Sequence, residues 1–154
     1  MQQAQDFYDE SQALASLVTP LSDVDFAQRT QFKGWTIDQI LRHLHVWNVA
    51  AGLSLQAPEA FDAFVLSMAA DLKGGRLPDF EARYLDGLSG EKLRSVWIEK
   101  ARDLAVAFGD ADPKARLKWV GPLLPKTISS NRCLCFCCGK VSCIRLCVIL
   151  NINF

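Results

Sequence analysis

Residues 1–132 contain no cysteine, and no acidic residue follows Asp112. All seventeen acidic residues lie between Asp6 and Asp112 beside ten basic ones, which gives this part of the chain a formal charge of −7. The other seven basic residues give the stretch from Pro113 onward a charge of +7, and all six cysteines follow residue 132. The formal net charge of zero is therefore the sum of two unlike pieces, and neither piece is neutral.

Other features that the sequence lacks limit the cellular compartments and the kinds of binding partner that can be expected. No stretch approaches the ~18–20 uninterrupted apolar residues of a membrane-spanning helix, and the N-terminus lacks the basic start and apolar core of a secretory signal. Half of the residues are hydrophobic and 22% are charged, which excludes a disordered chain and a coiled coil. Apart from Trp119 and Phe136, the late basic residues lack interleaved aromatic residues. We therefore expect a cytoplasmic protein with neither a membrane nor a nucleic-acid partner.

The chain also lacks the sequence motifs of several large enzyme classes. It contains no G-x-x-x-x-G-K-S/T phosphate loop, no G-x-G-x-x-G dinucleotide fingerprint and no G-x-S-x-G nucleophile elbow. No nucleotide-binding or serine hydrolase function is indicated by motif.

What the sequence does contain is five helical segments, in which apolar residues recur at three- and four-residue steps. Pro20 ends the first segment, Gly74 follows the third, and Gly109 closes the fifth. No useful alternation of apolar and polar residues precedes Pro113, so no strand is predicted there. We therefore predict an all-α fold, in its simplest form an antiparallel helix bundle. The segments cover about residues 4–20, 36–55, 58–72, 78–88 and 89–108.

The second segment has the clearest start signals. Thr36 is predicted to be its N-cap, and Asp38 in the first turn suits the positive end of the helix dipole. Pro58 marks the first turn of the following segment. The apolar stripe of the second segment comprises Ile37, Ile40, Leu41, Leu44, Trp47 and Ala51.

The two histidines of the chain, His43 and His45, both lie in this second segment. Imidazole is the commonest metal ligand in proteins, which makes both residues candidates for a metal site. Two residues correspond to about 200° of rotation around a helix, so the rings leave on opposite sides and one metal cannot easily bind both. Both positions flank the apolar stripe, so periodicity does not choose between them. Boundary histidines with ordinary hydrogen bonds are the competing interpretation.

The acidic residues give a weaker pattern. Asp9 and Glu10 could reach a site in the core of a bundle, although their spacing does not demand it. Four others fall off the apolar stripes of their segments and are expected on exposed faces: Asp62, Asp71, Glu99 and Asp103.

The cysteine cluster is a second candidate metal site. Cys135 and Cys138 have the C-x-x-C spacing of half a zinc knuckle, in which a tight turn aims two thiolates at one ion. Cys143 and Cys147 follow after an intervening loop of four residues, far shorter than in ordinary zinc fingers. A thioredoxin-like redox motif is disfavoured because no βαβ pattern precedes it. Zinc binding by the cysteines is therefore kept as a minor alternative.

Residues 34–44 read GWTIDQILRHL and resemble the N-terminal metal-binding domain of mycothiol-dependent maleylpyruvate isomerases, within the wider DinB-like group. In that family a G-W-T element leads into a helix whose histidine, followed by leucine, is the first metal ligand. His43 occupies that place and His45 does not. Residues 119–122, which read WVGP, are similar to a W-x-G-P element in one branch of the family. The resemblance covers about residues 5–122.

The resemblance implies a DinB-like four-helix bundle and a divalent metal, typically zinc. His43 would be one ligand and an E-x-x-x-H helix would supply two more, since residues four apart share a face of a helix. Mycothiol or a similar thiol would bind at the open positions, where a metal lowers the pKa of a thiol and delivers a thiolate nucleophile. The implied function is a thiol-dependent isomerase or transferase with a small-molecule substrate.

The chain departs from the family pattern after W-x-G-P. Arg132 aligns with an arginine of the expected motif, but Cys135 and Gly139 then stand where the glutamate and the histidine belong. Because Gly139 has no side chain, we expect weak or absent metal binding.

This departure divides the chain into a metal-binding helical domain over residues 1–122 and an aberrant, basic, cysteine-rich tail over residues 123–154. The last helix of the bundle would then be incomplete. A frameshift or a truncation after about residues 122–132 would explain the change in composition, and another reading frame of the gene would then encode E-x-x-x-H.

Two further functions stay open from the sequence. An incomplete bundle would expose an apolar groove, which would make the chain a non-catalytic helical interaction module. Alternatively, a helical body carries a cysteine-rich tail that binds zinc.

Overall fold

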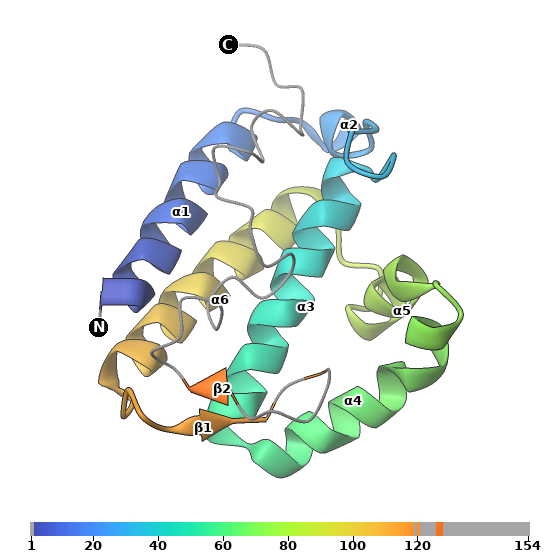
Figure 1. Ribbon diagram of the computed structural model, residues 1–154. Coiled ribbons are helices and arrows are strands. Elements are labelled where there is room, and N and C mark those ends of the chain that lie inside the picture. The colour runs from blue at the N-terminus through green and yellow to red at the C-terminus, as the bar shows by residue number, and fades with distance from the viewer. Residues whose placement is uncertain (1, 119, 121–125, 128–154) are drawn as a thin grey trace.

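The structure, a computed structural model, describes residues 2–118, 120, 126 and 127 (Figure 1). Six helices in this part of the chain confirm the all-α prediction, and two short strands pair in antiparallel fashion. The helices are α1 (Gln2–Val18), α2 (Asp23–Phe26), α3 (Ile37–Gln56), α4 (Pro58–Lys73), α5 (Leu77–Tyr84) and α6 (Gly90–Asp110). The strands are β1 (Arg116–Leu117) and β2 (Lys126–Thr127).

Local signals set the starts of α3 and α4 as predicted. Two predicted ends are wrong: α5 ends at Tyr84 rather than near residue 88, and Gly109 lies inside α6, which runs to Asp110. Thr36 caps α3 reciprocally with Gln39: the Thr36 hydroxyl accepts from Gln39 N at 3.1 Å, and the Gln39 side-chain oxygen accepts from Thr36 N at 2.8 Å. Pro58 opens α4, where its missing N–H costs no helical hydrogen bond. The periodicity does not indicate α2 or the strand pair, because four residues and two residues per strand are too few to show a period.

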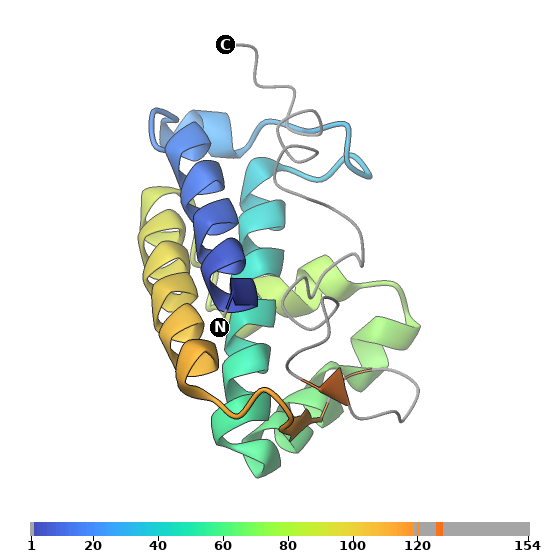
Figure 2. The same cartoon turned by 60° about the vertical axis from the view of Figure 1, so that its left-hand side comes forward.

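The central helix of the fold is α3. It packs against α6 on one side and against α4 and α5 on the other, while α1 packs mainly against α6 (Figures 1 and 2). Residues of α3 belong to all three buried hydrophobic clusters: Leu41 to the cluster with α1 and α6, Ala51 to the one at the far end of α6, and Trp47 to the one with α4 and α5. The buried surface of α3 is therefore wider than the predicted apolar stripe, because other helices pack against opposite sides of α3.

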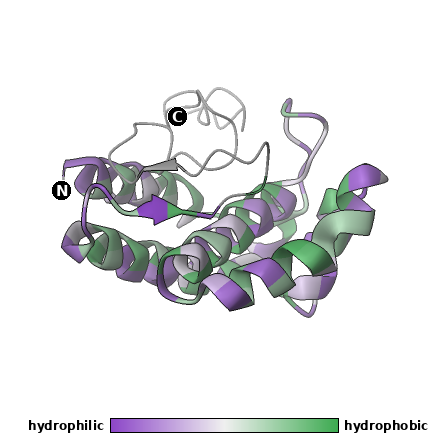
Figure 3. Cartoon of the chain, turned by 60° about the horizontal axis from the view of Figure 1, so that its bottom comes forward, coloured by the Kyte–Doolittle hydropathy of each residue, from purple (hydrophilic) through white to green (hydrophobic). Residues whose placement is uncertain are grey.

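The four long helices form a DinB-like bundle and alternate in direction along the chain. Even so, the adjacent helices α3 and α6 run the same way, because α4 and α5 together return the chain to the end where α3 begins (Figure 1). Hydrophobic and hydrophilic residues alternate around each helix, as expected where one face is buried (Figure 3). Within the described residues, no helix combines the length and the hydropathy that a membrane span requires.

The start of α6 is held by carboxylates from two other helices. Gly90 N donates to Asp38 Oδ1 of α3 at 2.8 Å, and Glu91 N donates to Asp23 Oδ1 of α2 at 3.3 Å. These bonds satisfy backbone donors that the helix itself leaves open, and a negative charge is favourable at this end of the helix dipole. Two long-range caps therefore fix where α6 begins relative to α2 and α3.

We expect Gly90→Ala to lower the free energy of unfolding by about 2 kcal/mol. Gly90 has a left-handed φ of +59°, and a Cβ there would overlap Asp23 Oδ1. Left-handed strain contributes about 1 kcal/mol, and rotating Asp23 away from the Glu91 N–H contributes about 1 more. Urea denaturation of the two proteins measures the difference.

The matched control for this substitution is Gly87→Ala. Gly87 has φ +71° with open space around it, so only the strain of about 1 kcal/mol applies. In an Asp23→Ala background the two alanine variants should lose equal stability. Equal losses with Asp23 in place would contradict the capping role of Asp23.

Candidate functional site

A buried pair of side chains joins α3 to α5. His43 Nδ1 lies 2.6 Å from Glu81 Oε1, and the two side chains are 13% and 1% exposed. A hydrogen bond between an imidazole and a carboxylate at this distance is short and charge-assisted. The His43–Glu81 pair therefore forms a short, buried polar link between these two helices.

Two indole rings flank the His43 imidazole. The ring centroids of Trp35 and Trp47 lie 5.4 Å and 5.9 Å from that of His43, both in edge-on orientation. The Trp47 Nε1 also lies 3.2 Å from His43 Nδ1. These rings limit the access of water to the pair and restrict rotation of the imidazole.

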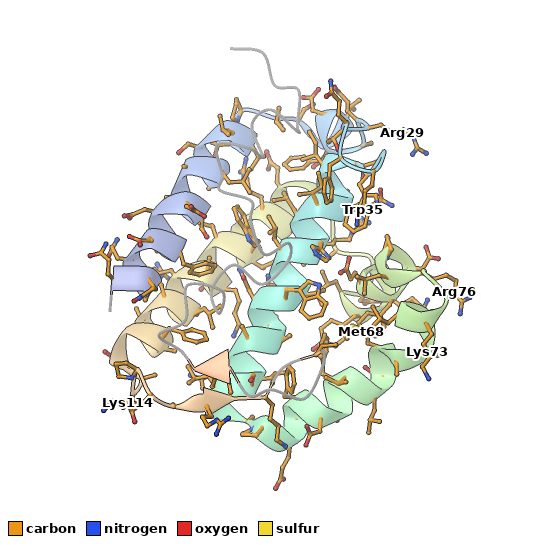
Figure 4. The ribbon with its side chains drawn as sticks, viewed as in Figure 1. Arg29, Trp35, Met68, Lys73, Arg76 and Lys114 are labelled. Carbon is orange, nitrogen blue, oxygen red and sulfur yellow. The ribbon has the colours of Figure 1, made fainter. Side chains whose placement is uncertain are left out.

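The loop before α3 places Trp35 at the site. The backbone N–H and the hydroxyl of Thr30 donate to Trp35 O at 2.8 Å and 2.9 Å, and Arg29 Nη1 donates to Gly34 O at 2.9 Å. Gly34 takes a left-handed φ of +68°, which turns the chain into the helix at low cost. Figure 4 shows Trp35 near the start of α3, with Arg29 on the outer side of the loop.

Two polar networks hold α5, and with it Glu81, in place. Arg42 of α3 donates from Nε to Leu88 O at 2.9 Å, just after the end of α5. Asp71, near the end of α4, accepts from Arg83 Nη2 of α5 at 2.7 Å. The carboxylate of Glu81 is therefore carried by a helix that is tied to α4, and the chain that follows this helix is tied to α3.

The prediction that Asp71 lies on an exposed face is wrong. Asp71 is 9% exposed, because α5 folds over the end of α4 and supplies Arg83, while Arg76 between the helices adds a contact of 3.4 Å. The other three acids of that prediction are exposed, as are the two N-terminal acids considered for a core site: Asp62, Glu99, Asp103, Asp9 and Glu10.

His45 lies on the side of α3 that faces α6. It is 9% exposed, and its Nδ1 has no hydrogen-bond partner among the described residues. Burial and, to a smaller extent, the charge of Lys100 lower the pKa of His45 to about 4. His45 is therefore neutral at pH 7. The two histidines have separate surroundings, as predicted from the rotation of about 200° between their positions on the helix.

Glu81 is the site residue that sequence reasoning missed. It lies four residues from Leu77 and four from Leu85, and both leucines pack against the buried cluster of α3 and α4. Residues four apart share a face of a helix, so the spacing of Glu81 from these two apolar residues could have predicted that its carboxylate is buried.

The His43–Glu81 pair suits one histidine ligand of a metal and the carboxylate that supports it. Among the described residues, no three His, Cys, Asp or Glu side chains are grouped so that they could hold a metal ion. Cys135 and Gly139 lie outside the described residues, together with the whole cysteine cluster. The described part of the chain thus offers His43 as a candidate ligand and contains no complete ligand set.

A DinB-like helical bundle with a buried histidine–carboxylate pair between α3 and α5 defines the class of this protein. The sequence profile of the mycothiol maleylpyruvate isomerase N-terminal domain matches residues 7–133, and the chain belongs to that family. The match runs beyond residue 122, where the domain boundary was predicted. Searches of the curated proteins and of the solved structures gave no match.

We expect His45 to make the protein sensitive to acid. The pKa of about 4 in the folded protein lies below the ordinary 6.5, so between these values the unfolded chain binds a proton that the folded chain does not. Stability is complete above pH 6.5 and falls with decreasing pH, by at most about 1.4 kcal/mol per pH unit.

Urea denaturation between pH 4 and 7 measures this effect as the difference between the parent and His45→Leu. The leucine variant should lose less stability on acidification, whereas His43→Leu should not reproduce that gain. The same pH slope in the parent and in His45→Leu would refute the assignment to His45.

Proposed function

We propose that the chain is a metal-binding helical-bundle protein related to thiol-dependent isomerases and transferases, with His43 as a metal ligand and an impaired metal site. The observation that carries the proposal is the 2.6 Å contact between His43 and the buried carboxylate of Glu81. Histidines that bind metals almost always donate their other ring N–H to a carboxylate, a carbonyl or water. The position of His43 after the G-W-T element supports the same assignment.

A divalent metal, zinc by resemblance, would lower the pKa of a bound thiol such as mycothiol and supply a thiolate nucleophile. The residues of this chain would orient the metal ligand and restrict water around it. His43 holds a ring nitrogen in a fixed orientation, and the rings of Trp35 and Trp47 restrict water around it. The partners in this proposal are the thiol and a small-molecule substrate.

Impairment of the site follows from the ligand count. Catalytic zinc sites use three protein ligands and one open position. The described residues give one imidazole and its supporting carboxylate, and Cys135 and Gly139 stand where the resemblance places the other two ligands. We therefore propose an affinity far below that of complete structural zinc sites, whose binding free energies are about 10 kcal/mol or more.

Zinc titration of the purified full-length chain, followed by calorimetry, tests this proposal. We expect weak binding that His43→Ala removes, because the substitution deletes the ligand. His45→Ala is the matched control, since His45 lies on the same helix but faces α6, and it should leave zinc binding unchanged.

Zinc binding by the cysteines is the outcome that would contradict this proposal. Tight zinc binding that survives His43→Ala and disappears when the thiols are alkylated would assign the metal to the cysteine cluster. That outcome would overturn the role proposed for His43.

A further inference from the structure

We infer that Glu81 is a positioning residue: its carboxylate accepts a hydrogen bond from the Nδ1–H of His43 and thereby keeps the lone pair of His43 Nε2 available to a metal. The role of Nε2 rests on the proposed function. The hydrogen bond and the tautomer that it selects are properties of the metal-free chain, so they can be tested separately.

Burial of the Glu81 carboxylate has a cost in stability. The Glu81 side chain is 1% exposed, and its Oε2 has no hydrogen-bond partner among the described residues. An unsatisfied buried polar group costs about 1–3 kcal/mol, and more when it is charged. Apolar residues often replace buried ionic groups without loss of stability. Fold stability alone therefore does not account for a glutamate at this position.

Glu81 and Trp47 compete for a hydrogen bond with His43 Nδ1. A neutral imidazole has one nitrogen that donates and one that accepts. If Nδ1 carries the proton, it donates to Glu81, and Nε2 keeps its lone pair. If Nδ1 is bare, it accepts from the Trp47 N–H, and the proton on Nε2 blocks a metal. The contact with Glu81 at 2.6 Å is much shorter than that with Trp47 at 3.2 Å, and it selects the first form.

Hydrogen bonds to two other helices hold the segment that carries Glu81 in place. Glu81 lies on α5, which is tied to α4 through Arg83 and Asp71, while the chain that follows α5 is tied to α3 through Arg42. A carboxylate held in this way fixes the rotation of the imidazole before any ligand arrives, which is the arrangement that precise binding sites need.

The test reads the tautomer directly, from the ¹⁵N NMR signals of the imidazole in the metal-free, full-length chain at a pH where the ring is neutral. The His45→Gln background leaves His43 as the one imidazole in the molecule. We expect a protonated Nδ1 and a bare Nε2. Glu81→Leu should move the proton to Nε2, because Trp47 can then donate to the bare Nδ1.

The same signals, followed during titration with zinc, report affinity even when binding is weak. Glu81→Leu should reduce zinc affinity 10–100-fold, the usual effect of losing a residue that supports a metal ligand. The free energy of unfolding should be unchanged or higher, so the loss of affinity cannot be a loss of folding. Glu81→Gln retains an oxygen acceptor for the Nδ1–H and should restore the tautomer with a smaller loss of affinity.

Asp79→Asn is the matched control, since Asp79 is an exposed carboxylate on the same helix. It should change neither the tautomer nor the zinc affinity. A bare Nδ1 in the parent, or a protonated Nδ1 that survives Glu81→Leu, overturns the positioning role. A changed tautomer without a lower zinc affinity overturns it as well. Zinc affinity that is unchanged in His43→Ala overturns the proposed function instead. This conclusion does not depend on which tautomer His43 has in the parent chain.

Discussion

The burial of α3 on opposite sides is the constraint on which the rest of the structure depends. With α6 against one side and α4 and α5 against the other, α3 cannot rotate without disturbing all three hydrophobic clusters. This fixed rotation directs His43 to α5 and His45 to α6. One imidazole is therefore paired with a carboxylate and the other is kept neutral by burial, although only two residues separate them.

Hydrophobic packing around α5 outweighs the cost of burying Glu81 between α5 and α3. Phe80, adjacent to Glu81, is 5% exposed and packs edge-on against Phe64, whose ring in turn meets that of Trp47. Burial of each such side chain contributes about 1.5–3 kcal/mol, so three aromatic residues exceed the ~1–3 kcal/mol of an unsatisfied polar group. The packing of the aromatic cluster can thus keep the Glu81 carboxylate buried, although the carboxylate by itself would be more stable in water.

The G-W-T element joins three physical tasks in consecutive residues. Gly34 supplies the left-handed turn, Trp35 supplies the ring that flanks His43, and Thr36 supplies the cap that starts α3. The element therefore determines both where the helix begins and what surrounds its histidine. A short motif thus shapes the surroundings of a histidine seven residues after its last member.

The sequence by itself determined the five longer helices, although not α2 or the ends of α5 and α6, since caps and apolar periods are local properties that act over a few residues. It also singled out His43, because the G-W-T element precedes it in the same segment. It did not determine that Asp71 is buried or that Glu81 meets His43, a contact between residues 38 positions apart. The tertiary structure decided both, because only the folding of α5 across α3 and α4 removes those carboxylates from water and gives them partners.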